Sequence, residues 1–144
     1  MDKILYERDF VMWVENTVTQ LKQKNFADID LENLIDEVES LGKRDKRELK
    51  SRLITLFEHL LKRHYVPLPE CYRGWEVTIR RTQSKLQDLL DDSPSLKNLL
   101  EEIYLSCYEE AIANMSIEYD VEFPEEYPFL NQSQGLLEEM KLND

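Results

Sequence analysis

Turn-forming residues are scarce in this sequence, which holds only 3 glycines and 5 prolines in 144 residues. A β-sandwich or barrel needs a turn every few residues, so this scarcity disfavours both and favours a mostly helical chain. No stretch approaches the roughly 18 uncharged apolar residues of a membrane span. With 42% hydrophobic and 33% charged residues, the composition is typical of a globular protein with a heavily charged exterior.

Cysteine is equally rare. Cys71 and Cys107 lie 36 residues apart, neither belongs to a C-x-x-C pair, and no histidine cluster accompanies them. We therefore expect two free thiols in a reducing compartment. Because the first residues show no basic-then-apolar signal layout, the sequence predicts a cytoplasmic protein.

Basic residues are outnumbered overall and unevenly placed. The formal net charge is −12, yet the segment from Lys43 to Lys85 holds 12 Lys/Arg against 5 Asp/Glu. The negative net charge argues against general nucleic-acid binding, whereas the basic segment could still bind nucleic acid locally. The densest part of this segment, called the basic run below, forms a candidate basic patch: Lys43, Arg44, Lys46, Arg47 and Lys50.

Amphipathic segments account for most of the chain. Apolar residues recur at three- and four-residue spacing over about 7–24, 31–65, 72–91 and 94–119, a pattern typical of helices with one buried face. Asp30 lies at the N-cap position of the second segment, and Ser93 followed by Pro94 indicates the start of the fourth. Gly42 falls on the apolar stripe of the second segment. Either the helix is interrupted at Gly42, or it is continuous and Gly42 lets another helix approach closely.

Four such segments joined by short connections bury their apolar faces most simply as an antiparallel four-helix bundle. The sequence therefore predicts a single all-α domain over residues 1–144, with its core over about 5–120 and one long central helix. An extended, proline-containing tail is predicted over about 121–144, with a short terminal helix near 133–140. The aromatic residues Phe10, Trp13 and Trp75 are interpreted as core anchors.

Motifs for catalysis and metal binding are missing. A di-metal carboxylate site in a helical bundle needs Glu-x-x-His on two helices, but His59 and His64 follow leucines at that spacing. The sequence also contains no G-x-S-x-G and no Gly-rich phosphate loop. It predicts no catalytic residue, no cofactor and no metal site. Whether the protein is an enzyme is left open, with the balance against it.

Several polar residues lie on or near the apolar stripe of the predicted long helix. A carboxylate in such a place must be paired or solvated. Asp45 falls in phase with the apolar stripe, and Arg52 lies near its border. An inter-helical salt bridge is the favoured interpretation, and a ligand-binding pocket is the alternative. The candidate polar cluster is Glu37, Asp45, Arg52 and His59.

Several phrases of the sequence occur together, and in the same order, in one known family. They are LYERDF at 5–10 with Trp13, DLENLIDEVESLG at 30–42, SRL at 51–53 with HLLK at 59–62, DSPSL at 92–96, and FPE at 123–125. Together they resemble the bacterial, mainly cyanobacterial, family catalogued as domain of unknown function 29. The resemblance implies a compact helical protein and implies no activity.

The absence of a catalytic motif and the dipolar charge distribution lead to one functional prediction. We expect a non-catalytic helical module that binds a protein partner or a second copy of itself, since uneven charge favours steered association. A nucleic-acid-binding accessory protein acting through residues 43–85 is the runner-up, and an uncharacterised enzyme is a further alternative. No membrane partner is expected.

Overall fold

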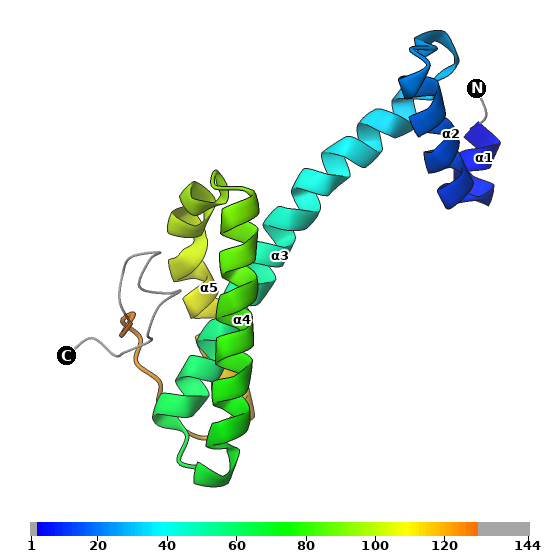
Figure 1. Cartoon of the computed structure of the whole chain (residues 1–144). Coiled ribbons are helices and arrows are strands. Elements are labelled where there is room, and N and C mark those ends of the chain that lie inside the picture. Colours follow the sequence, from blue (N-terminus) through cyan, green and yellow to red (C-terminus); the bar gives the residue numbers. More distant parts are fainter. Residues whose placement is uncertain (1–2, 130–144) are drawn as a thin grey trace. The chain divides into compact units, whose positions relative to one another are not determined.

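The structure is a computed structural model that describes residues 3–129 (Figure 1). Five α-helices follow one another: α1 (Lys3–Arg8), α2 (Phe10–Lys22), α3 (Leu31–Tyr65), α4 (Tyr72–Asp92) and α5 (Leu96–Glu118). Two short 3₁₀ turns, η1 (Phe26–Asp28) and η2 (Pro69–Cys71), precede α3 and α4. No β-strand occurs among the described residues, so the predicted all-α class is confirmed.

Two predicted helices are found with almost the expected bounds. α3 runs without interruption through Gly42, and Asp30 caps it, because one carboxylate oxygen accepts a hydrogen bond from the Asn33 amide at 3.3 Å. α4 extends one residue beyond the predicted end. The predicted tail helix near 133–140 lies outside the described residues.

The other two helices differ from the prediction at a cap. The segment predicted as one helix over 7–24 is split into α1 and α2, because the Asp9 carboxylate accepts a hydrogen bond from the Met12 amide at 3.0 Å and starts a new helix. α5 begins at Leu96 rather than at Pro94, because Ser93 is the C-cap of α4 and its amide donates to the Leu89 carbonyl.

The chain divides into two compact units, called unit 1 (residues 1–44) and unit 2 (residues 45–144). The boundary falls within α3, so residues 31–44 of that helix belong to unit 1 and residues 45–65 to unit 2. The single domain and the antiparallel four-helix arrangement stay predictions.

Unit 2 has one contiguous hydrophobic core, built by α3, α4, α5 and the segment that follows α5. Phe57 lies at its centre, edge-to-face with Tyr108 at 5.8 Å and with Tyr127 at 5.6 Å between ring centroids. The Tyr108 hydroxyl donates to the Pro124 carbonyl at 2.6 Å, which fastens the proline-containing segment to α5. Trp75 is only half-buried and packs against this core, so it anchors the core from its edge.

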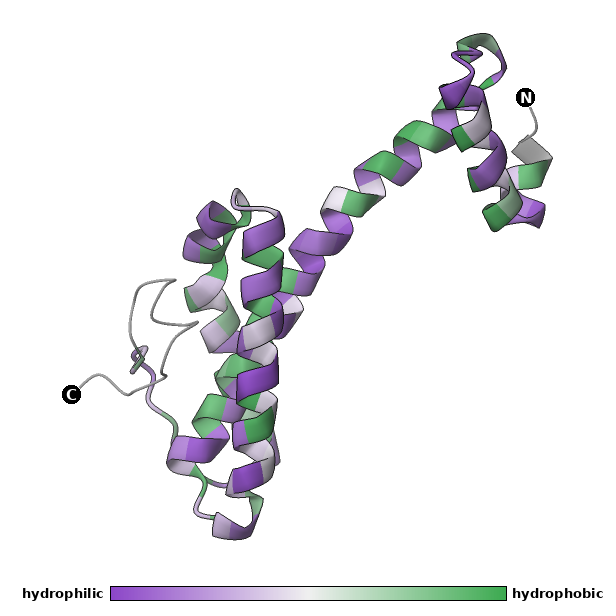
Figure 2. Ribbon diagram, viewed as in Figure 1, coloured by the Kyte–Doolittle hydropathy of each residue, from purple (hydrophilic) through white to green (hydrophobic). Residues whose placement is uncertain are grey.

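Unit 1 buries much less. Its buried hydrophobic residues are Leu5, Trp13 and Ile29. Trp13 is thus the core anchor that the sequence predicts, whereas Phe10 is 46% exposed and the prediction for it is wrong. Apolar residues recur along α2 and the first part of α3 (Figure 2), and most of them face solvent. The large exposed ones are Phe10, Val11, Met12, Val14, Val18, Leu21, Phe26, Leu31, Ile35, Val38 and Leu41.

None of the described helices is both long enough and apolar enough to cross a membrane.

Candidate interaction groove in unit 1

An apolar groove lies between α2 and the first part of α3. Its volume is about 340 Å³. The residues come at helical spacing from both helices, so the stripe predicted to face a core faces the groove instead. Its lining, which defines the term apolar groove below, is Phe10, Trp13, Val14, Thr17, Val18, Leu21, Leu34, Glu37, Val38, Leu41 and Arg44.

Aromatic side chains pack around Trp13, which lines the groove. Trp13 is 4% exposed and stacks with Phe10 at 5.7 Å, while Tyr6 meets Trp13 edge-on at 4.8 Å. The Thr17 hydroxyl donates to the Trp13 carbonyl at 2.7 Å, so its polar atom is satisfied within α2 and its methyl group is left to the groove. A hydrophobic groove of this kind can receive the apolar face of an amphipathic helix.

Two charged residues, Glu37 and Arg44, line the groove along one edge of α3. The Tyr6 hydroxyl donates to the Glu37 carboxylate, which ties α1 to α3. This hydrogen bond raises the pKa of the Tyr6 phenol, because it and the nearby negative charge disfavour a phenolate. Arg44 is exposed, one helical heptad beyond Glu37. The groove therefore carries an acidic and a basic group on the same edge.

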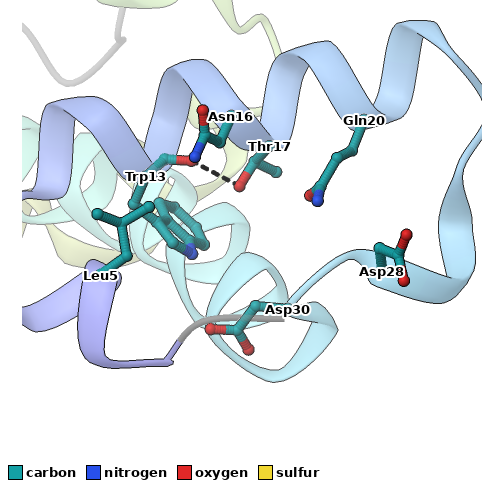
Figure 3. A pocket seen from close by; sticks show the side chains of 7 residues that line it. All are labelled: Leu5, Trp13, Asn16, Thr17, Gln20, Asp28 and Asp30. Carbon is teal, nitrogen blue, oxygen red and sulfur yellow. Dashed lines mark hydrogen bonds between the residues drawn. The ribbon is translucent and has the colours of Figure 1, made fainter.

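A smaller polar pocket lies on the other side of Trp13, with a volume of about 130 Å³ (Figure 3). The Trp13 indole N–H is buried and has no hydrogen-bond partner in the part of the chain that the structure describes. Both Asp30 oxygens accept hydrogen bonds from Asn33, and Asp28 accepts one from Asn25 at 2.7 Å. These carboxylates stabilise the chain reversal before α3, and the pocket has room for only a few water molecules, at about 30 Å³ each.

The predicted polar cluster is distributed along α3. Glu37 lies in unit 1, and the other three members lie in unit 2. Asp45 and His59 are 14 residues apart, about 21 Å along a helix, which is too far for one small-molecule pocket. Arg52 pairs with Glu48, one turn away on the same helix, at 2.9 Å.

His59 is held by its own helix. Its Nδ1 lies 2.9 Å from the Thr55 carbonyl oxygen. Burial lowers the pKa of His59, an effect that the hydrogen bond to Thr55 opposes in part. The imidazole is thus kept neutral by its surroundings and belongs to the packing of unit 2.

The five cations of the basic run are all exposed. Two further cations near the end of α3 are engaged elsewhere. Arg63 lies 4.2 Å above the Tyr72 ring and pairs with Glu76 at 2.7 Å. Lys62 lies 5.9 Å above the Trp75 ring. These two cations serve the packing of α3 against α4.

The two thiols are free, as predicted. Cys71 is half-buried, and Cys107 is buried. Burial raises the pKa of the Cys107 thiol to about 11, so it stays protonated and unreactive at neutral pH. Within residues 3–129, no group of three or more His, Cys, Asp or Glu side chains is placed to hold a metal ion.

The fold and the groove define an all-α protein with an open apolar face between two helices. Residues 5–140 match the model of a family described as Domain of unknown function DUF29, and the chain belongs to that family. No curated protein and no solved structure matches it.

Proposed function

We propose that the chain is a non-catalytic helical module that binds a partner protein through the apolar groove of unit 1. The observation that carries the proposal is that eleven large hydrophobic side chains are exposed among the described residues of unit 1. Six of them line the apolar groove, namely Phe10, Val14, Val18, Leu21, Val38 and Leu41. Monomeric proteins rarely leave a contiguous apolar surface of this kind uncovered, and such surfaces are typical of protein interfaces. Charged residues at its edge suit an interface with a polar rim.

The size of unit 1 supports the same conclusion. A chain of about 40 residues rarely folds alone without disulfides, metal ions or association. Unit 1 contains no cysteine, and among its described side chains only three large hydrophobic residues are buried. A partner helix in the groove would supply the missing apolar contacts. We place this association in the cytoplasm, where free thiols such as Cys71 remain reduced.

Site-specific photo-crosslinking in the native host tests the proposal. A photoreactive amino acid is introduced at Val38, which lines the groove and is 60% exposed. The matched control is Ile117 in unit 2, which is 88% exposed. We expect a discrete crosslinked product at position 38 and none at position 117.

The outcome also reports the kind of partner. A product at twice the chain mass of 17.3 kDa indicates self-association, and any other discrete mass indicates a different protein. Equal labelling at both positions, or no product at position 38, would contradict the proposal.

Nucleic acid remains the alternative partner, because the cations of the basic run are all exposed. Each phosphate contact would release counterions and make binding fall steeply with salt. We expect no gel shift with random single- or double-stranded nucleic acid at physiological salt. A shift that disappears when Lys46, Arg47 and Lys50 are changed to glutamate would promote this alternative.

A further inference from the structure

The part of α3 that belongs to unit 1 has a heptad pattern. Leu34, Val38 and Leu41 are spaced by four and three residues and form an apolar seam. All three line the apolar groove. The seam is flanked on the groove edge by Glu37 and Arg44, which occupy equivalent heptad positions seven residues apart.

This pattern is self-complementary when two copies of the helix lie antiparallel. In a coiled-coil register that packs Val38 against Leu41 of a second copy, Glu37 lies opposite the second copy's Arg44. The two-fold axis repeats each contact, so both ends of the seam carry an acid–base pair. Flanking charge pairs of this kind set orientation and register in coiled coils.

The opposite edge of the seam fits the same register. Ile35 is 53% exposed and would lie opposite Gly42 of the second copy. Gly42 is exposed, and no described atom lies within 4 Å of the position that a Cβ would occupy there. Within one copy this open glycine only weakens the helix, whereas against a second helix it leaves room for the Ile35 side chain.

We propose that the partner in the groove is a second copy of this chain, paired through residues 35–44 of α3 in antiparallel orientation. The inference rests on the proposed function and names its partner. A two-fold interface uses the same patch on both copies. The seam meets this condition, because Glu37, Arg44, Ile35 and Gly42 all lie on one helix. The exposed stripe of α2 would cover the seam from each side.

The first test measures the mass of the purified full-length chain by sedimentation equilibrium at micromolar concentration. We expect a dimer, and we expect Val38→Asp to raise the dissociation constant at least 100-fold, because it places a charge in an apolar seam. The control variant Ile117→Asp, in unit 2, should leave the dimer intact. Circular dichroism of both variants establishes that they remain folded.

The second test uses charge reversal and mixing. Glu37→Arg alone and Arg44→Glu alone should each weaken self-association, because every dimer would then hold like charges at both pairs. An equimolar mixture of the two variants restores both pairs, and we expect a heterodimer about tenfold tighter than either homodimer, in keeping with the modest strength of exposed pairs. This comparison is insensitive to any general loss of stability.

The result that overturns the inference is a monomeric wild-type chain, or a dimer that Val38→Asp and the mixing test leave unchanged. A monomeric chain that still gives a groove-specific crosslink to another protein in the host refutes the second copy and retains the proposed function. Loss of the groove-specific crosslink altogether refutes the proposed function itself.

Discussion

The two units of the chain use the same helical periodicity with opposite results. Within its described residues, 45–129, unit 2 buries 18 hydrophobic residues in one cluster and exposes only three large ones, Val77, Leu105 and Ile117. Among the side chains described in unit 1, three large hydrophobic ones are buried and eleven are exposed. The units differ in how many elements cover each apolar face. In unit 2, three helices and a tail segment enclose one core. An amphipathic stripe therefore shows that a helix must be covered, without showing by what.

The largest expected difference between the units concerns side-chain truncation. Phe57 is fully buried and surrounded by aromatic rings, so Phe57→Ala should lower the free energy of unfolding by about 3–5 kcal/mol. Leu41 is 56% exposed, and Leu41→Ala should cost less than about 1 kcal/mol in dilute solution, where the groove is uncovered. Urea denaturation of each variant at low protein concentration measures both values.

A large cost for Leu41→Ala in dilute solution would mean that another part of the chain covers the groove. The comparison between the units would then fail, and with it the main support for a docking site. Repeating the measurement at higher protein concentration adds a check, because an interface residue becomes more costly to truncate as association increases.

The sequence predicts the helices well and their surroundings poorly. Leu49 and Leu41 lie on the same stripe of α3, yet Leu49 is fully buried and Leu41 is 56% exposed. Periodicity cannot separate them, since the difference arises from helices that are distant in sequence. The sequence predicts that the apolar groove residues form a buried helical stripe, whereas it assigns Glu37 to the polar cluster and Arg44 to the basic patch.

The errors at the helix ends have local causes. Asp9 and Ser93 are both good N-cap residues, but Asp9 divides a segment that is periodic on both sides, and Ser93 is already used to end α4. A capping residue indicates that a helix boundary is close. Which of two neighbouring helices it serves depends on the path of the chain.

Two tyrosines in unit 2 should differ in how much their hydroxyl groups contribute to the free energy of unfolding. Tyr108 donates to the Pro124 carbonyl at 2.6 Å, whereas the buried Tyr127 hydroxyl has no hydrogen-bond partner within residues 3–129. Tyr108→Phe should therefore lower the free energy of unfolding by about 1–2 kcal/mol, and Tyr127→Phe should be neutral or slightly stabilising. Thermal denaturation ranks the two variants, and the reverse order would contradict the hydrogen-bond assignment.

Each unit has an exposed glycine on a helix: Gly42 lies in the interior of α3 and Gly74 in the first turn of α4. Gly42 in α3 and Gly74 in α4 both have free space around the Cβ position. Replacing either by alanine should stabilise a monomeric helix by up to about 1 kcal/mol. If a second α3 covers Gly42, only Gly42→Ala should weaken self-association, and sedimentation of both variants would show it. Equal behaviour of the two variants would remove Gly42 from the interface.

The smallest expected effect is a response of unit 2 to mild acid. Both histidines of the chain, His59 and His64, lie in unit 2, and burial lowers the pKa of each below its usual value near 6.5. Between the folded and unfolded pKa values the unfolded chain binds more protons, so stability rises with pH across that window. The contribution is complete above about pH 6.5 and is lost as the pH falls toward the folded pKa.

Melting temperatures at pH 7.5 and 5.5 measure this contribution. We expect the wild-type chain to melt at a lower temperature at pH 5.5, and the double variant His59→Gln, His64→Gln to show a smaller difference between the two values. The quantity to compare is the change in melting temperature between the two pH values. The absolute melting temperatures are not compared, because losing the contact of His59 with the Thr55 carbonyl lowers stability at every pH. An unchanged difference would show that other groups cause the acid response. Unit 1 contains no histidine, so the Trp13 environment should change less than that of Trp75 over this range.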